Sequence, residues 1–302
     1  MKWVFFVGLL FLISACTPAE RDQPYAPSGV RDVKNAGPLQ VQLFVNPDPR
    51  ERNLTIEDGL QVGLYFVNRD KDPIQGIISL EDTPNEEQFG GLIGRGLEDF
   101  EVPGMQQNKA GWATVFPGSQ PIFYEDDKNT LKSTSFVVEV RYHREIEFTS
   151  DEFWMRKLLN ERPRDCKKNC DEVNSVASNH QSISTIREKL FDFNGDFQVD
   201  SMQLEFSLEE GSCEIISYEK AQSFEPVEEK ESVFMELSLQ QSGNIFDCNV
   251  KEDSSEKRKA IICLIDNSLQ GGDYADRVMG KIKYGCKLLL KSGEIQFGSK
   301  ED

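Results

Sequence analysis

The chain carries little of the side-chain chemistry that enzymes use near neutral pH, because His143 and His180 are its only histidines. Serine and cysteine hydrolases usually need a histidine base, and the sequence around these two shows no recognisable partner. His143 lies in a stretch that predicts a strand, which favours a surface or cross-strand role. The sequence also lacks a Gly-Xaa-Ser-Xaa-Gly elbow and a His-Glu-Xaa-Xaa-His motif. We therefore expect no enzymatic activity.

One group of acidic and amide side chains has the composition of a metal site: Asp192, Asn194, Asp196 and Asp200. An EF-hand loop needs glycine at its sixth position and a bidentate glutamate at its twelfth. Here the glycine is fourth, and neutral Gln203 stands at the twelfth position, so the EF-hand interpretation fails. A looser carboxylate site that binds calcium is one remaining hypothesis, and a plain turn that opens a strand is the other. We expect no cofactor.

Two further stretches are candidates for surface contacts. Asn53-Leu54-Thr55 is the only glycosylation sequon, and it predicts surface exposure if the source organism glycosylates exported asparagines. Gly90 to Gly96 is rich in glycine but lacks the Gly-Lys-Ser/Thr ending of a phosphate-binding loop. We interpret this stretch as a flexible loop between strands and as the best candidate for a binding element in the first half of the chain. The flanking Phe100 and Trp112 are expected to pack in the core.

Cysteine usage indicates an oxidising compartment. Setting Cys16 aside, an even set of cysteines lies in the second half of the chain: Cys166, Cys170, Cys213, Cys248, Cys263 and Cys286. Such a set is typical of disulfides in exported proteins, and the sequence alone does not fix the pairing. Our preferred pairing joins Cys166 to Cys170 in a local loop, Cys248 to Cys263 across a hairpin, and Cys213 to Cys286 between sheets. A zinc site is the competing hypothesis, but its usual close cysteine pairs are missing.

The seventh cysteine, Cys16, follows a short charged start, an apolar run from Trp3 to Ile13, and two small residues. This arrangement is typical of a secretory signal peptide, and the apolar run is too short for a spanning helix. Ile13-Ser14-Ala15-Cys16 resembles the lipobox of prokaryotic lipoproteins, in which the cysteine is lipidated and becomes the mature N-terminus. The resemblance implies a signal peptide over 1–15 and a lipid anchor at Cys16 on the outer side of a membrane.

Acidic residues dominate the composition. Asp and Glu number 52 against 34 Lys and Arg, which gives a formal net charge of -18. A surface of this kind repels phosphate backbones, and no basic stripe interrupts it, so we expect no nucleic-acid partner. The acidity also suits a tethered protein that stands clear of anionic headgroups.

Alternation of apolar and polar residues predicts strands over most of the remaining chain. The predicted strands of the first half are 39–45, 60–67, 73–80, 112–116, 122–124 and 136–148. Those of the second half begin near Met202 and are 202–208, 213–218, 233–239, 245–250, 260–265, 280–290 and 295–297. A faint repeat relates Val138–Tyr142 to Gly280–Tyr284 and favours two tandem domains of one class. Several short strands separated by turns favour antiparallel sandwiches.

The stretch between these halves has a different spacing of apolar residues. Phe153, Trp154, Leu158 and Leu159 have helix-like spacing, as do Ile183, Ile186 and Leu190. We predict two short helices joined by the Cys166–Cys170 loop. The predicted organisation is a signal peptide over 1–15, a lipidated N-terminus and tether over 16–37, a sandwich over 38–150, a helical linker over 151–198, a second sandwich over 199–298 and a tail over 299–302.

The stretch Gly59 to Asn68 is similar to the strand-and-turn pattern of CARDB-type immunoglobulin-like domains on archaeal and bacterial cell surfaces. Those domains usually place a glycine two positions after the asparagine, where this chain has Asp70. The resemblance implies an all-β protein of two immunoglobulin-like antiparallel β-sandwiches joined by a short helical linker. Together with the lipobox, it implies a prokaryotic surface lipoprotein.

The expected function is therefore a non-catalytic role in binding, adhesion or envelope organisation at the outer side of a membrane. The expected partners are the membrane, through the lipid anchor, and an envelope protein or polysaccharide. The alternative is a lipid-anchored solute- or calcium-binding protein, or an enzyme, with a site between the domains around Asp192, Asn194 and Asp196.

Overall fold

The computed structural model describes residues 27–48, 50, 54–55, 58–83, 89–90, 96–118, 120–125, 133–155, 170–192, 200–224, 233–251, 255–266 and 274–298. Within these ranges every helix or strand element is a strand, and every strand pairing is antiparallel. The all-β prediction is confirmed.

The smaller of the two main sheets lies near the N-terminal end. It has four strands in the order β1 (Val30–Ala36), β2 (Leu39–Asn46), β3 (Gln61–Asn68) and β7 (Gly111–Val115). Strand β2 alternates as the sequence predicted from Leu39 to Leu43, with Leu39, Val41 and Leu43 fully buried. These side chains pack under the larger sheet, as the stacking of Phe66 on Phe100 at 4.6 Å illustrates.

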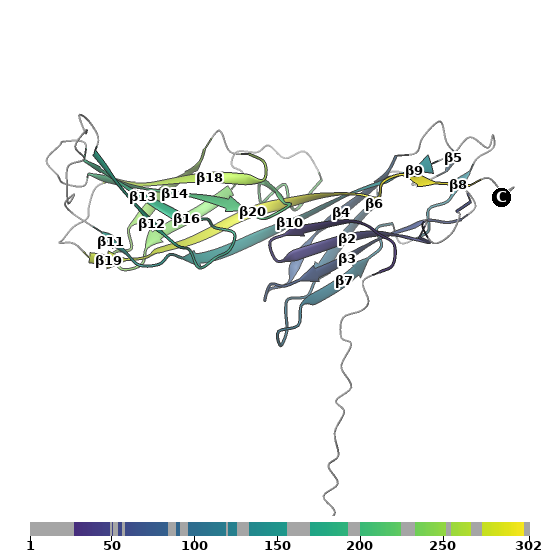
Figure 1. Ribbon diagram of the computed structural model, residues 1–302, viewed down its shortest axis with the longest axis horizontal. Coiled ribbons are helices and arrows are strands. Elements are labelled where there is room, and N and C mark those ends of the chain that lie inside the picture. The colour runs from purple at the N-terminus through teal and green to yellow at the C-terminus, as the bar shows by residue number, and fades with distance from the viewer. Residues whose placement is uncertain are drawn as a thin grey trace, which may run out of the picture.

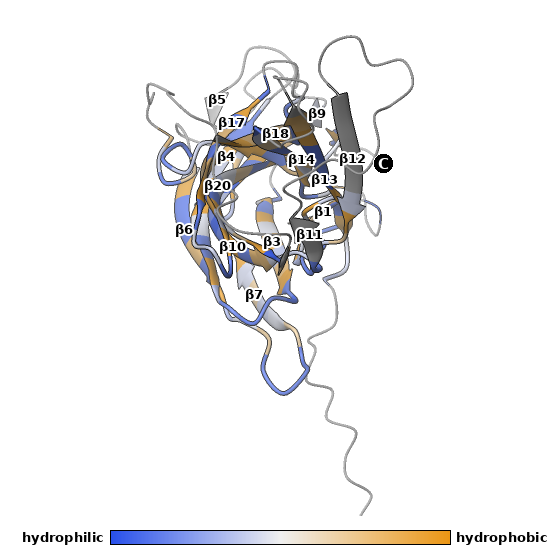
Figure 2. Ribbon diagram, turned by 90° about the vertical axis from the view of Figure 1, so that its left-hand side faces the viewer, coloured by the Kyte–Doolittle hydropathy of each residue, from blue (hydrophilic) through white to orange (hydrophobic). Residues whose placement is uncertain are grey.

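The larger sheet has eleven strands. Its order is β12 (Cys170–Val176), β13 (Ile186–Asp192), β14 (Ser201–Glu209), β18 (Arg258–Asp266), β17 (Ile245–Val250), β16 (Val233–Leu239), β20 (Val278–Lys291), β10 (Phe136–Thr149), β4 (Ile74–Asp82) and β6 (Gly96–Val102), and β15 (Glu214–Ile216) also pairs with β20. The sheet curls, so that β14 faces β10 (Figure 2). The rings of Phe148 on β10 and Phe206 on β14 meet edge to face, with centroids 5.7 Å apart. Three short pairs complete the fold: β11 (Phe153–Met155) with β19 (Tyr274–Asp276), β21 (Ile295–Gln296) with β9 (Ser133–Thr134), and β5 (Phe89–Gly90) with β8 (Tyr124–Glu125).

Two long strands join the halves of the molecule. β10 and β20 are 14 residues each and pair along nearly their whole length, from Val137 opposite Lys291 to Thr149 opposite Met279. Figure 1 shows them side by side along the long axis of the molecule. Because their inward side chains contribute to one continuous apolar core, the two predicted sandwiches are not separate units. The domain boundary predicted near residue 150 therefore needs correction. β10, from the first predicted sandwich, and β20, from the second, are neighbours in one sheet.

The predicted helical linker is wrong where the structure describes it. Phe153 to Met155 form a strand, and the stretch from Ile186 to Asp192 is strand β13. The alternation of β13 was hidden because Glu188 occupies an inward position between Ile186 and Leu190 and is 1% exposed. A buried charged residue removes the apolar signal of period two and leaves the helix-like spacing of its neighbours. Residues 156–169, which hold the rest of the first predicted helix, lie outside the described residues.

The predicted tether over 16–37 also extends too far, since β1 begins at Val30. β1 is an edge strand that pairs with β2 alone, and it carries Arg31, Asp32 and Lys34. Charged side chains are common on edge strands, which are held by backbone hydrogen bonds and need no apolar stripe. Its polar composition therefore made β1 look like linker.

Disulfides join Cys213 to Cys286 and Cys248 to Cys263. Both are pairs that the sequence analysis preferred. Cys248 and Cys263 are directly opposite on the hairpin of β17 and β18, as expected. The other pair was expected between sheets, but Cys213 adjoins β15, which pairs with β20 beside Cys286 in the same sheet. Two disulfides are typical of an oxidising, extracytoplasmic location.

The described residues contain no helix that is long and apolar enough to cross a membrane.

Candidate binding pocket at the edge of β10

Strand β10 carries the candidate site, because its side chains alternate strictly between the core and the outside. Tyr142, Arg144 and Ile146 point inward and are buried, whereas the adjoining Glu145 and Glu147 are exposed. Arg144 is 7% exposed, which is unusual for a charged residue unless it is paired. The sequence pattern thus places a guanidinium in the middle of an apolar stripe.

A gap opens along one edge of β10. β4 pairs with this edge as far as Gly76 opposite Tyr142. Gly76 allows that close approach, since a Cβ there would lie 2.2 Å from the carbonyl oxygen of Arg141. Before Gly76, β4 stays paired with β6 but separates from β10. The edge of β10 is engaged again at Thr149, whose N–H donates to Asn179 Oδ1 at 2.8 Å.

The wedge between the diverging strands is a pocket of about 680 Å³. Its lining comes from the β3–β4 turn, the start of β4, five consecutive residues of β10 and one residue of the loop after β12: Asp70, Asp72, Pro73, Ile74, Gln75, His143, Arg144, Glu145, Ile146, Glu147 and His180. A pocket on one face of a strand would be lined by alternate residues of that strand. Consecutive lining residues mean that the pocket faces the edge of β10.

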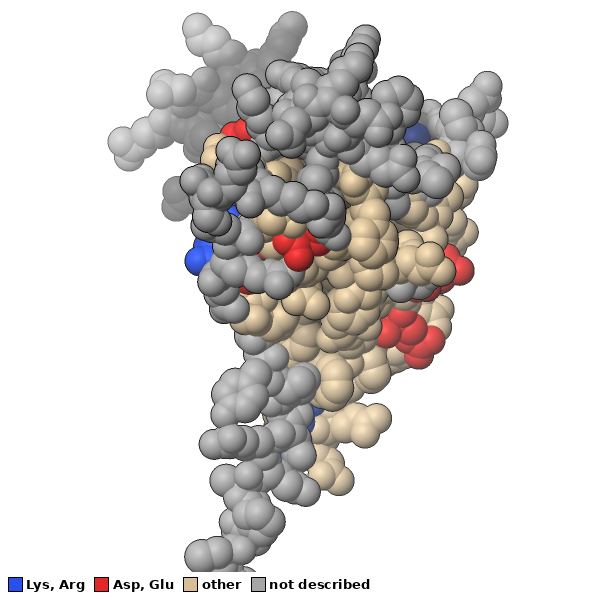
Figure 3. Space-filling model, turned by 90° about the vertical axis from the view of Figure 1, so that its right-hand side faces the viewer, with Lys and Arg blue, Asp and Glu red and all other residues tan. Residues whose placement is uncertain are grey.

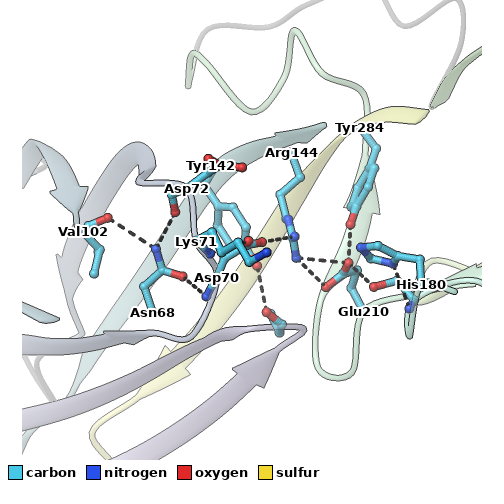
Figure 4. Close-up of polar contacts among 12 residues, drawn as sticks. Asn68, Asp70, Lys71, Asp72, Val102, Tyr142, Arg144, His180, Glu210 and Tyr284 are labelled. Atoms are coloured by element: carbon cyan, nitrogen blue, oxygen red, sulfur yellow. Dashed lines mark hydrogen bonds and ion pairs between the residues drawn. The ribbon is translucent and has the colours of Figure 1, made fainter. Parts of the chain in front are cut away.

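A buried ionic network stands beside the pocket (Figure 4). Arg144 Nη1 lies 3.3 Å from both carboxylate oxygens of Glu210, and Nη2 lies 2.6 Å from Asp70 Oδ2. Glu210 Oε1 also accepts hydrogen bonds from Ser182 Oγ at 2.6 Å and from the Tyr284 hydroxyl. Every carboxylate of this network is therefore engaged, and Arg144 is fixed at the pocket wall.

Burial and nearby charge oppose each other in their effect on the pKa of Arg144 but act together on that of Tyr284. Burial is the largest single effect on Arg144 and works against its charge, but Glu210, Tyr284, Tyr142 and Asp70 together outweigh it, so the pKa of Arg144 is raised. Burial and the Glu210 carboxylate hold the pKa of Tyr284 well above its usual value. The guanidinium stays charged and the phenol stays neutral, which is the state that the hydrogen bonds require.

Two tight turns bring the partners of Arg144 into place. At the β1–β2 turn, Gly37 has a φ of +54°, and a Cβ there would lie 1.8 Å from Glu210 Oε2. At the β3–β4 turn, the fully buried Asn68 donates to the carbonyl oxygen of Asp72 at 2.8 Å and accepts from the N–H of Asp70. Asp70 is the residue that stands where the CARDB pattern has glycine, and here it pairs with Arg144.

The two histidines of the chain line this pocket, although they are far apart in the sequence and no motif relates them. Burial lowers the pKa of both, and for His180 the charge of Arg144 lowers it further. Nδ1 of His180 accepts a hydrogen bond from the N–H of Ser182 at 3.2 Å. The ring of His143 contacts Tyr218 with centroids 4.8 Å apart. Both imidazoles are therefore neutral near pH 7.

Most residues singled out from the sequence lie elsewhere. Cys16, Asn53, Cys166, Asn194 and Asp196 are outside the described residues, and so are 91–95 of the glycine-rich loop. Cys170 and Asp192 are opposite each other in the pairing of β12 with β13. The N–H of Asp200 donates to the carbonyl oxygen of Phe191 at 2.8 Å. In the part of the chain that is described, His, Cys, Asp and Glu form no group of three or more suited to a metal ion.

Sequence analysis missed Arg144, Glu210 and Asp70. A signal was present for the first, since Arg144 interrupts the inward positions of a strand otherwise filled by Phe136, Val138, Val140, Tyr142, Ile146 and Phe148. Glu210 sits in the turn after β14 and gave no such signal. Of the predicted core aromatics, Phe100 is buried, whereas Trp112 is 43% exposed on β7.

No protein-family model, curated protein or solved structure matches this chain, so its site is interpreted from geometry and charge alone.

Proposed function

We propose that this protein is a lipid-anchored, non-catalytic binding protein on the outer side of a membrane, and that it holds its partner in the pocket beside β10. The observation that carries the proposal is the pocket itself, which has about 680 Å³ of space beside a wall fixed by the Arg144 network. A site whose polar groups are already oriented binds with less loss of conformational freedom.

The network supports binding more than catalysis. Glu210 is a poor candidate for a general base, because Arg144, Tyr284 and Ser182 all engage its carboxylate. Nδ1 of His180 is likewise engaged by the N–H of Ser182. A general base has to be within reach of a substrate proton and free to take it. These contacts favour a role in which the side chains hold the pocket wall in place.

The proposed location rests on the sequence from Met1 to Cys16, and the two disulfides support it. A diacylglyceryl group on Cys16 would hold the chain on a membrane stably, since two acyl chains give a firm anchor where one does not. Residues 17–29 would then form the tether. The immunoglobulin-like class of the sheets is a further proposal, supported by the resemblance in Gly59–Asn68, which includes β3.

The acidic composition supports a partner other than nucleic acid. Seen from the end of the molecule that carries β9, the described surface shows separate acidic patches and little Lys or Arg (Figure 3). An envelope protein or polysaccharide remains the proposed partner class.

The anchor is tested by Cys16→Ser. We expect the variant to leave the detergent-soluble membrane fraction and to accumulate in the aqueous fraction. An unchanged membrane fraction would contradict the anchor.

The binding role is tested with the mature chain and envelope fragments of the source organism. We expect saturable binding that is lost when Asp72, which is exposed at the pocket, is changed to Lys. Asp247→Lys, a matched charge reversal at an exposed position of β17, is expected to bind like the wild type. Equal binding by both variants, or turnover of a substrate without binding, would contradict the proposal.

A further inference from the structure

We infer that the open edge of β10 binds a short, extended polypeptide segment with basic side chains, which adds to the sheet as a further strand. This inference rests on the proposed function and names the partner class of the same pocket. Addition of a strand to a sheet edge is an established mode of peptide recognition, in which backbone hydrogen bonds give affinity and side-chain contacts give specificity.

The direction of the backbone groups follows from the pairings at the two ends of β10. Phe136 faces β20, since its N–H and C=O bond to Ser292. Thr149 faces the other edge, since its N–H and C=O bond to Asn179. Backbone groups of a strand alternate between its edges, so the odd-numbered residues face away from β20. Glu145 and Glu147 therefore turn their N–H and C=O groups toward the pocket.

Within the described residues, this part of the edge has no strand partner. The pairing with β4 ends at Tyr142, and the next contact on that side is Asn179 with Thr149. The open stretch from Arg144 to Phe148 has five residues and is about 17 Å long at 3.3 Å per residue. It matches an extended segment of about five residues, and the pairings at both ends limit how far such a segment can run along β10.

The charges at the pocket favour a basic segment. Four carboxylates line it, from Asp70, Asp72, Glu145 and Glu147, against the single guanidinium of Arg144. Arg144 pairs with Glu210 and Asp70, and Glu145 pairs with Lys281 and Lys283, so Asp72 and Glu147 are the lining carboxylates that a basic segment would meet. Glu147 is 77% exposed at its side chain, and it lies 4.0 Å from Lys281 in a long ion pair. A Lys or Arg opposite Glu147 would form a cross-strand pair, which stabilises a sheet.

The same charges disfavour a second copy of this chain as the occupant. Antiparallel self-pairing of the edge would bring Glu145 and Glu147 of both copies together, and like charges opposite each other destabilise a sheet. On the inward side, Ile74 and Ile146 line the pocket and are at most 5% exposed. A segment that alternates basic and apolar residues would place its basic side chains beside the glutamates and its apolar ones beside the isoleucines.

The probe is the synthetic peptide acetyl-Val-Lys-Val-Lys-Val-Lys-amide, labelled with a fluorophore and titrated onto the full chain in detergent. We expect saturable binding, and at least tenfold weaker binding of the peptide with Glu in place of Lys. Two further peptides carry N-methyl groups on the valines or on the lysines. Because alternate N–H groups of a strand face opposite edges, only one methylation frame should abolish binding. Equal binding by all four peptides would overturn the inference.

The protein side of the test uses Glu145→Pro and Glu145→Ala. Both remove the carboxylate, but only proline removes the N–H that faces the pocket. Proline is tolerated on edge strands when the lost N–H is not part of the ladder, so the variant is expected to fold. We expect Glu145→Pro to bind the valine-lysine peptide about tenfold more weakly than Glu145→Ala, as for the loss of one backbone hydrogen bond. Equal affinities, at equal melting temperatures, would overturn the inference.

The outcome separates the inference from the proposed function. If envelope fragments bind the wild type and Glu145→Pro equally, and no peptide binds, strand addition is wrong while the binding role stands. If the peptides bind as expected but Cys16→Ser stays in the membrane fraction, the anchor is wrong while strand addition stands.

Discussion

The two faces of β10 hold their charged side chains in different environments. Arg144 and Glu145 are neighbours in the chain, yet Arg144 points into the core and Glu145 points outward. The inner guanidinium pairs with carboxylates from distant segments, the fully buried Glu210 and the partly exposed Asp70. The outer carboxylate lies in a ladder with Lys281 and Lys283 on β20, where water competes for every charge. The buried pair helps to determine the structure, whereas the exposed ladder can exchange partners.

Removing the inner carboxylate should have the largest effect. Glu210→Ala leaves Arg144 buried with a single carboxylate partner, and loss of one partner of a buried pair costs about 3–5 kcal/mol. Urea unfolding should show this loss as a lower midpoint with an unchanged slope. The double variant Arg144→Met with Glu210→Met should recover much of it, because apolar side chains often replace a buried ion pair without cost. A double variant no more stable than Glu210→Ala would contradict this account of the inner face.

The glycine beneath the network is the next position to test. Gly37→Ala combines a positive φ with a Cβ only 1.8 Å from Glu210 Oε2, and we expect a loss of about 2–4 kcal/mol. Gly243→Ala is the matched control, since Gly243 has a φ of +70° and a Cβ added there would meet nothing within 4 Å. That control should lose about 1 kcal/mol from backbone strain alone. Equal losses in urea unfolding would show that Gly37 does not act through Glu210.

Acidification should weaken the fold through the two histidines. Their folded pKa values are lowered, so below the unfolded value of about 6.5 the unfolded chain binds more protons and stability falls as the pH falls. Protonation of His180 would also remove the acceptor that the N–H of Ser182 uses, beside Arg144, Glu210 and Asp70. The melting temperature of His180→Gln should therefore change less than that of the wild type between about pH 7.5 and 5.5, on either side of the unfolded pKa. Parallel profiles would exclude His180 as a contributor.

The outer ladder should give the smallest effect. Glu145→Gln removes the charge that faces Lys281 and Lys283, and exposed ion pairs stabilise folded proteins only weakly. We expect a shift in the urea midpoint much smaller than that of Gly243→Ala, and one that disappears in high salt. A loss comparable to that of Glu210→Ala would mean that the two faces do not differ.

Sequence reasoning succeeded where side-chain alternation was regular. The strands β2, β10, β14 and β20 were predicted nearly to their ends, since their inward positions are almost all apolar. It failed at β1 and β13, where charged residues on an edge or at a buried position removed the pattern. Strand existence depends on local sequence, and in these two strands the local signal was missing.

The candidate site could not be predicted from the sequence for a different reason. It depends on strand pairings between distant segments of the chain. The faint repeat of Val138–Tyr142 and Gly280–Tyr284 was interpreted as a sign of tandem domains, whereas the two segments lie on paired strands. Both repeated tyrosines come to the network, with the hydroxyl of Tyr142 donating to the carbonyl oxygen of Ala36 at 3.3 Å and that of Tyr284 donating to Glu210. The register of β10 against β20 brings the two tyrosines together, and no single stretch of the sequence determines that register.

The most direct test of the open edge is amide hydrogen exchange along β10 in the protein without any peptide. The account predicts slow exchange at Arg144 and Ile146, whose N–H groups face β20, and fast exchange at Glu145 and Glu147, whose N–H groups face the pocket. Addition of the valine-lysine peptide should then slow Glu145 and Glu147 alone. Equal protection of all four amides in the free protein would show that the edge is already covered and would contradict strand addition.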